Sequence, residues 1–173
     1  MNIHTGRQGT TKPRISQRDL DRVTSAVGGA RQVEDIYPLS ALQQGMLFHC
    51  QYEPQSAVYL TTQSCRLSGA LDAAAFARAW QVVVDRHGVL RTAFVGQDLD
   101  APLQVVLRGC AVPFETHDWR DLPAGEQDAR FAALRQSERA RGFDLAAPPL
   151  MRLALIRLAA ERHRLIWTAH HLL

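Results

Sequence analysis

The sequence contains little cysteine and almost no lysine. Cys50, Cys65 and Cys110 are its three cysteines, and they are widely spaced without a C-x-x-C pair. An odd and scattered set of this kind indicates neither a disulfide framework nor a zinc site. We therefore expect buried free thiols in a reducing cytoplasm. Lys12 is the single lysine, so arginine supplies the other 19 of the 20 basic residues.

Long apolar runs and a dense basic stripe are absent as well. The longest apolar stretch, residues 150–158, is interrupted by Arg152 and Arg157, so the sequence predicts no membrane span. Residues 1–12 lack the apolar core of a signal peptide. A formal net charge of +3 is far below that of a nucleic-acid binder. With 46% hydrophobic and 21% charged residues, the composition is that of one globular domain.

The N-terminal part of the chain combines a polar lead-in with one short helix. Residues 1–14 are polar and contain glycine and proline, which predicts a flexible segment. Ser16 and Asp19 form a capping box that predicts a helix ending at Gly28-Gly29. Its narrow apolar stripe favours docking on a larger body or linking two modules. We interpret residues 1–35 as a linker or docking segment and residues 36–173 as the main lobe.

The main lobe alternates predicted helices and strands. Ser40 and Asp72 are N-caps of two helices, and a third helix is expected at residues 124–141. On the helix after Asp72, the side chains expected to share one face are those of Phe76, Trp80, Val83 and His87. The predicted strands are residues 57–67, 89–95, 103–107 and 112–117, followed by a hairpin of residues 150–158 and 164–171 that turns at 159–163. This order predicts a single two-layer α/β lobe in which His163, in the turn, is solvated.

Two adjacent histidines, His170 and His171, end the last predicted strand. Successive side chains of a strand face opposite sides, so one histidine should enter the packing and the other should reach the surface. An imidazole titrates near neutral pH and can accept a proton in acyl transfer. A metal site formed with His117 is disfavoured because the two adjacent side chains diverge.

Three segments, in this order, resemble the condensation domains of nonribosomal peptide synthetases. Residues 40–49 (SALQQGMLFH) resemble the family's opening motif, and residues 86–94 (RHGVLRTAF) resemble its RHExLRTxF motif. Residues 170–173 (HHLL) resemble the first four positions of its HHxxxDG motif. The resemblance implies a chloramphenicol-acetyltransferase-like lobe with a mixed sheet packed against helices. In complete domains two such lobes enclose a channel.

The same resemblance implies partners and a reaction. Upstream and downstream carrier domains deliver phosphopantetheine-bound substrates, and an acceptor amine attacks a donor thioester to form an amide. No metal, nucleotide or directly bound cofactor is implied. His171 matches the second histidine of the third motif, which faces the channel and accepts a proton from the amine or positions it. His170 is expected to face the interior with structural hydrogen bonds.

The second motif is expected to be structural. Arg86 and His87 lie at a helix end, where they should cap carbonyl groups and pack. Arg91 matches the arginine that pairs with the aspartate of the third motif, which would fall two residues beyond Leu173. We therefore expect Arg91 to lack a partner and the apolar strand end to be exposed. With the C-terminal lobe also missing, we expect the 173 residues alone not to catalyse condensation.

Three alternatives remain at this level. The chain could be a stand-alone or oligomeric acyltransferase of the same fold, with its channel completed by a neighbouring subunit. It could be a lobe of an epimerisation domain, which shares the fold and the histidine motif. It could also be a non-catalytic module that docks a carrier through the residues before 35.

Overall fold

The computed structural model describes residues 15–53 and 56–173, so the lead-in expected at residues 1–14 lies outside the described residues. In chain order the elements are α1 (Gln17–Ala26), η1 (Ala30–Gln32), β1 (Val33–Pro38), α2 (Ala41–Tyr52), β2 (Leu60–Ser68), α3 (Ala73–Arg86), η2 (Gly88–Arg91), β3 (Thr92–Val95), β4 (Leu103–Leu107), β5 (Phe114–Asp118), α4 (Ala124–Ala140), β6 (Met151–Ala159) and β7 (Arg162–His170). Within this described part, no helix combines the length and the apolarity that crossing a membrane requires.

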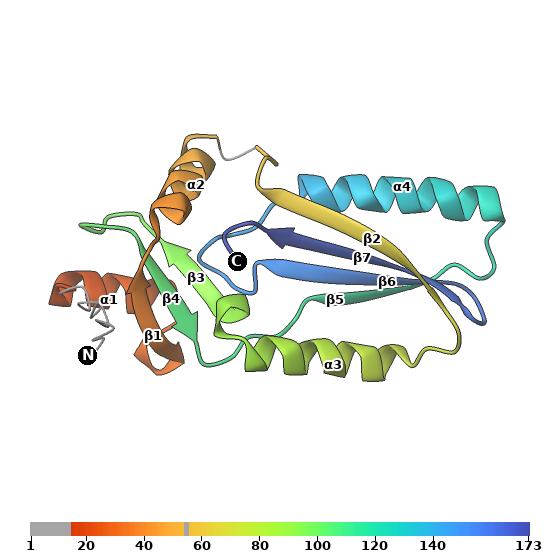
Figure 1. Ribbon diagram of the computed structural model, residues 1–173, viewed down its shortest axis with the longest axis horizontal. Helices are drawn as coiled ribbons and strands as arrows, with labels where there is room; N and C mark the ends of the chain where they lie inside the picture. Colours follow the sequence, from red (N-terminus) through yellow and green to blue (C-terminus); the bar gives the residue numbers. More distant parts are fainter. Residues whose placement is uncertain (1–14, 54–55) are drawn as a thin grey trace, which may run out of the picture.

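The larger of two sheets has the strand order β2-β7-β6-β5, and α3 and α4 run along it (Figure 1). β5 pairs with β6 in parallel, whereas the other pairs are antiparallel. Leu153 and Leu165 pack with α3, and their neighbours Ala154 and Ile166 pack with Phe131 of α4. Since successive strand residues face opposite sides, both faces of this sheet are covered. The α/β fold is confirmed, but helices on both faces make three layers where two were expected.

The hairpin of β6 and β7 supplies most of this core. β6 is buried from Met151 to Ile156, as expected for a strand covered on both faces. The turn is shorter than predicted, because β7 already begins at Arg162. His163 therefore lies within β7 and is 4% exposed, so the prediction that it is solvated was wrong. Burial lowers the pKa of His163 below its usual value.

The smaller sheet has the order β1-β4-β3 and is covered by α1. The Oγ atom of Ser16 accepts the amide N–H of Asp19 at 3.1 Å, which confirms the predicted cap of α1. Val23 of α1 is fully buried against the β3–β4 pair. β1 was not predicted, because it contains Pro38 and only its pairing with the distant β4 makes it a strand.

Two local predictions around α3 need correction. Val84 is fully buried while Val83 is 40% exposed, so the buried line of α3 continues from Trp80 to Val84 and not to Val83 and His87. The predicted strand at residues 89–95 begins as a 3₁₀ turn, and extended structure starts only at Thr92.

Candidate functional site

The histidine pair lies at the end of β7, where the two side chains take opposite environments. His170 is the last residue of β7 and is 6% exposed. His171 follows in a turn and is exposed. The pleat of the strand produces this divergence, as the sequence predicted.

His170 is held by two contacts in the interior. Its Nδ1 atom accepts the amide N–H of Leu172 at 3.1 Å, and its Nε2 atom lies 3.6 Å from Sγ of Cys50 in α2. Because Nδ1 accepts a hydrogen bond, the neutral ring carries its proton on Nε2, which therefore donates toward Cys50. Burial, together with the neighbouring His171, lowers the pKa of His170 to about 4. This imidazole is therefore neutral at physiological pH.

His171 is held from the neighbouring strand β2. Its amide N–H donates to the carbonyl oxygen of Tyr59 at 2.9 Å. Its Nε2 atom lies 2.7 Å from Oγ1 of Thr61. Because Leu60 pairs with His170, its two neighbours Tyr59 and Thr61 lie beside His171. Tyr59 holds the backbone of His171, and Thr61 contacts its ring. The exposed ring thus has a defined position at the edge of a rigid sheet.

The first sequence motif also contacts this turn. Ser40 is the N-cap of α2, as predicted, and it forms a capping box with Gln43 through hydrogen bonds of 3.2 and 3.0 Å. Gln43 Nε2 also donates to the carbonyl oxygen of Leu172 at 3.3 Å. The Leu172 side chain is 1% exposed and packs with the cluster that includes Met46 and Phe94. The prediction of an exposed apolar strand end was therefore wrong for Leu172.

The second motif divides into a buried and an exposed part. Arg91 is 5% exposed, and its Nη1 atom lies 2.7 Å from Oε2 of Glu34 in β1. The same guanidinium donates to the carbonyl oxygens of Val84 and Leu107. Arg91 therefore has a carboxylate partner, and the expectation that it would be unpaired was wrong.

Arg86 and His87 are exposed at the end of α3. The backbone N–H of His87 donates to the carbonyl oxygens of Val83 and Val84 at the end of α3, and the His87 side chain makes no capping hydrogen bond at the start of η2. The capping at this helix end is therefore done by the backbone.

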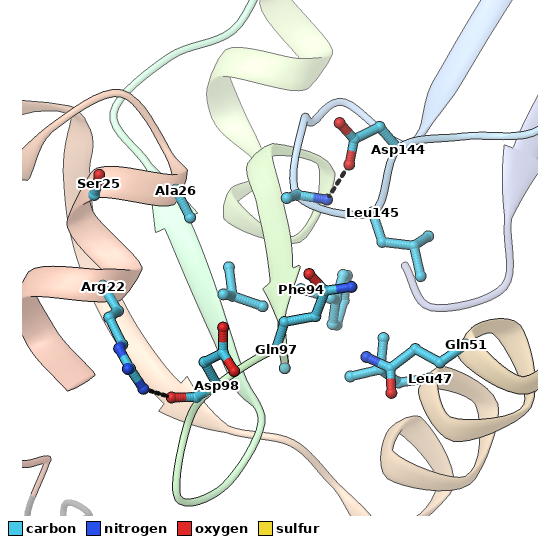
Figure 2. A pocket seen from close by; sticks show the side chains of 13 residues that line it. Arg22, Ser25, Ala26, Leu47, Gln51, Phe94, Gln97, Asp98, Asp144 and Leu145 are labelled. Atoms are coloured by element: carbon cyan, nitrogen blue, oxygen red, sulfur yellow. Dashed lines mark hydrogen bonds between the residues drawn. The ribbon is translucent and has the colours of Figure 1, made fainter.

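One open cavity lies away from the histidines. It has a volume of about 530 Å³ and lies between α1, α2, the turn after β3 and residues 144–146 (Figure 2). A smaller cavity of about 140 Å³ adjoins His170 beside Cys50 and Phe143. His171 lines neither of these two cavities, and it is an exposed residue.

The described residues do not bring together a metal-binding group. They contain no cluster of three or more histidine, cysteine, aspartate or glutamate side chains with suitable geometry. His117 lies on β5, which β6 separates from the histidine-bearing β7.

Sequence reasoning missed three residues of this site, Cys50, Tyr59 and Thr61. Both Tyr59 and Thr61 fell within the strand predicted at residues 57–67, but the observed β2 begins at Leu60, so Tyr59 lies in the turn before it. No local pattern indicated that this strand pairs with β7. The cysteines were expected to be buried, but Cys65 is exposed and Cys50 and Cys110 are partly buried. No pattern indicated that Cys50 lies beside His170.

Comparisons with known proteins agree on one family. A family model described as "Condensation domain" matches residues 33–173. The chain is 41% identical over 159 residues to one of the linear gramicidin synthase proteins of Brevibacillus parabrevis, covering 92% of this chain and 3% of that protein. It is 36% identical over 148 residues to tyrocidine synthase 2 of the same organism, covering 86% of this chain and 4% of that protein. The chain thus spans a very small part of these relatives.

Solved structures give the same result. The starter condensation domain of rhizomide synthetase RzmA matches with a TM-score of 0.70 and 27% identity, covering 80% of this chain and 34% of that chain. The first condensation domain of the calcium-dependent antibiotic synthetase, in complex with a substrate analogue, matches with a TM-score of 0.68 over 80% of this chain and 35% of that chain. Its 22% identity supports the fold alone.

Proposed function

Because this chain belongs to the condensation-domain family of nonribosomal peptide synthetases, we propose that it forms the N-terminal lobe of an amide-forming domain. The observation that carries the proposal is an exposed His171 held by β2 at the end of a buried strand, inside the segment that the family model matches. The substrates would be a donor acyl or peptidyl thioester and an acceptor aminoacyl thioester. Phosphopantetheine on upstream and downstream carrier domains would present both.

His171 is the proposed proton acceptor. The acceptor nitrogen forms a bond to the thioester carbonyl carbon, the carbon–sulfur bond breaks, and the donor thiolate leaves. The proton released by the nitrogen passes to the imidazole of His171 and then to the leaving sulfur, which regenerates the neutral ring. An exposed imidazole anchored at the end of a sheet suits this role, because its position is set while one ring nitrogen stays accessible.

We also propose that a second lobe covers α2 and forms the other wall of the site. Three large apolar side chains of α2 are strongly exposed: Leu42 (73%), Phe48 (69%) and Tyr52 (76%). The same helix contacts the histidine turn through Gln43.

The described cysteines Cys50, Cys65 and Cys110 are all free, which supports a reducing cytoplasmic location.

Amide formation with loaded carriers tests this function. The lobe is assayed alone and together with a condensation-domain C-terminal lobe, and the dipeptidyl product on the acceptor carrier is measured by mass spectrometry. We expect product only with both lobes, and its loss in His171→Ala. His87→Ala is the control, since it removes an exposed histidine at the end of α3. Product formation by His171→Ala at the parent rate would overturn the proposal.

A further inference from the structure

Within the part of the chain that the structure describes, the imidazole of His171 has one hydrogen-bonding partner, the hydroxyl of Thr61, and the role of this hydroxyl is open. The Oγ1–Nε2 distance of 2.7 Å is short for a neutral pair and indicates a well-formed hydrogen bond. Thr61 lies in the interior of β2, opposite Ala169 of β7. Threonine is stiff at χ1, so its hydroxyl is presented from a nearly fixed position at little entropic cost.

This hydrogen bond leaves the two ring nitrogens in different situations. Nε2 is engaged by Thr61, whereas Nδ1 has no hydrogen-bonding partner among residues 15–53 and 56–173. In a neutral imidazole, one nitrogen carries the proton and the other has the free lone pair. If Thr61 donated to Nε2, the proton would sit on Nδ1 and the accessible nitrogen could not act as a base. If Thr61 accepts from Nε2–H, the accessible Nδ1 is the free base.

We propose that Thr61 is the positioning residue of His171: its hydroxyl oxygen accepts the Nε2–H and leaves Nδ1 to take the proton of the attacking amine. Both the direction of this hydrogen bond and the role of Nδ1 rest on the proposed function, because an Nδ1 that accepts a proton requires the ring proton to be on Nε2. When Nδ1 is protonated, the Nε2–H···Oγ1 bond becomes charge-assisted and therefore stronger. Thr61 thus both orients the ring and supports the cation that forms during the transfer.

The adjacent residue offers a matched control. Thr62 points to the other side of β2, where its Oγ1 lies 3.4 Å from Oγ1 of Thr168. Thr61→Val and Thr62→Val remove the same atom from neighbouring positions of one strand. Thr61→Ser keeps the hydroxyl and removes only a methyl group.

Nuclear magnetic resonance of the 173-residue chain, with ¹⁵N in the histidine rings, tests the geometry without any activity. The spectra are recorded at about pH 8.5, where an ordinary imidazole is neutral. We expect the His171 proton on Nε2 and a through-space contact between the ring and the Thr61 methyl group. Thr61→Ser and Thr62→Val should keep the ring ¹⁵N shifts of His171, and Thr61→Val should change them. A wild-type proton on Nδ1, or unchanged shifts in Thr61→Val, would overturn the proposal.

The signals of His170 report on folding in every variant, because that ring is fixed independently by Leu172 and Cys50. If Thr61→Val disturbs them, Thr61→Ala is substituted and judged by the same spectra. In the two-lobed amide assay, Thr61→Val should lower the turnover rate about 10- to 100-fold with little change in acceptor KM, and Thr61→Ser should restore it. If His171→Ala leaves the turnover rate in that assay unchanged, the proposed function is refuted, but the spectroscopic result on the Thr61–His171 hydrogen bond is not affected.

Discussion

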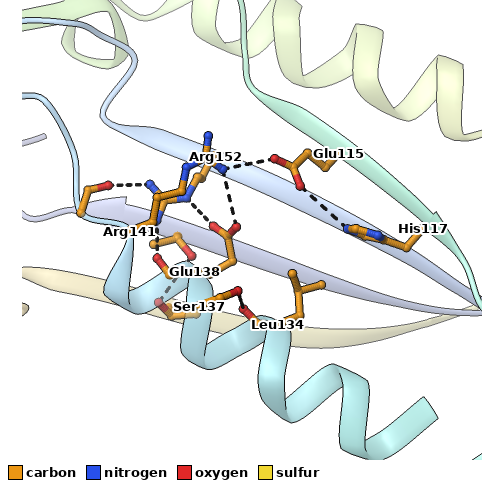
Figure 3. Close-up of polar contacts among 10 residues, drawn as sticks. Glu115, His117, Leu134, Ser137, Glu138, Arg141 and Arg152 are labelled. Carbon is orange, nitrogen blue, oxygen red and sulfur yellow. Dashed lines mark hydrogen bonds and ion pairs between the residues drawn. The ribbon is translucent and has the colours of Figure 1, made fainter. Parts of the chain in front are cut away.

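A buried ion pair between β6 and α4 allows a direct test of how much paired buried charges contribute to the stability of this fold. The side chains of Arg152 and Glu138 are each 7% exposed and paired through the Arg152 Nε atom (Figure 3). Arg152 also donates to the carbonyl oxygen of Glu138 and, at 2.8 Å, to that of Gly142. Its guanidinium lies over the ring of Phe143, 4.3 Å from the centroid. One side chain thus ties the end of α4 and the following connection to the central hairpin.

We expect Arg152→Met to be far more costly than Glu138→Gln. Without the guanidinium, the buried carboxylate of Glu138 keeps only the exposed Arg141 at 3.9 Å, and two carbonyl groups lose their donor. Removing one partner of a buried pair in this way costs about 3–5 kcal/mol. In Glu138→Gln, Arg152 keeps both carbonyl acceptors and the Phe143 ring, and the glutamine oxygen can still accept. That loss should be about 1–2 kcal/mol.

Urea unfolding monitored by circular dichroism measures these differences as changes in midpoint at constant slope. Arg141→Met is the matched control: Arg141 is 58% exposed in the same network (Figure 3), so its loss should change stability by about 0.5 kcal/mol or less. The double variant of Arg152→Met with Glu138→Leu should recover part of the loss, because no buried charge remains unpaired. A cost of Arg152→Met below about 1 kcal/mol, or no greater than that of Glu138→Gln, would show that the buried ion pair does not stabilise the fold in this way.

Three further predictions concern the core, the buried pair of the second motif and the pH dependence. Val23→Ala should lower the free energy of unfolding in urea by about 2 kcal/mol, because two buried methyl groups contribute about 1.6 kcal/mol and the cavity adds to the loss. As a control, Arg18→Ala on the exposed side of α1 should leave the free energy of unfolding unchanged. Arg91→Met should lower the free energy of unfolding by about 2–3 kcal/mol. Glu34→Gln should lower it by about 1 kcal/mol or less, because Glu34 is half exposed and two carbonyl groups still hold Arg91. Equal losses in the two variants would contradict this difference. In the folded chain His170 stays neutral down to its pKa of about 4, whereas in the unfolded chain it binds a proton near pH 6.5. The free energy of unfolding should therefore be greatest above pH 6.5 and fall by about 2–3 kcal/mol towards pH 4. Unfolding of His170→Asn across this range should show a shallower slope, and an unchanged slope would assign the effect to other groups.

Local chemistry explains which elements the sequence could predict. The caps at Ser16, Ser40 and Asp72 each use a side chain and an amide two or three residues apart, so a short window contains the whole interaction. β1 could not be found in this way. It contains Pro38, and its ladder partner β4 lies far along the chain, so only tertiary pairing makes it a strand.

The same distinction holds for the candidate site. The opposite orientation of His170 and His171 follows from strand periodicity alone. Their partners do not, because Thr61 and Cys50 precede them by 110 and 120 residues. Arg91 is a similar case: its carboxylate partner was sought beyond Leu173, but Glu34 lies 57 residues upstream. Such pairings depend on the register of strands, which no sequence motif within the chain specifies.

The packing of α1 changes how the segment before residue 35 should be tested. The family model begins at residue 33, yet Val23 of α1 is fully buried against the small sheet, and Arg22 donates to the carbonyl oxygen of Asp98 in the turn after β3. A deletion of residues 1–30 therefore removes part of a hydrophobic core together with any docking surface, and we expect it to lower the unfolding midpoint. Loss of carrier binding in that deletion could then arise from unfolding alone. Substitutions on the exposed side of α1, such as Arg18→Glu, separate the two effects, because they alter the surface that a carrier would contact and leave Val23 in place.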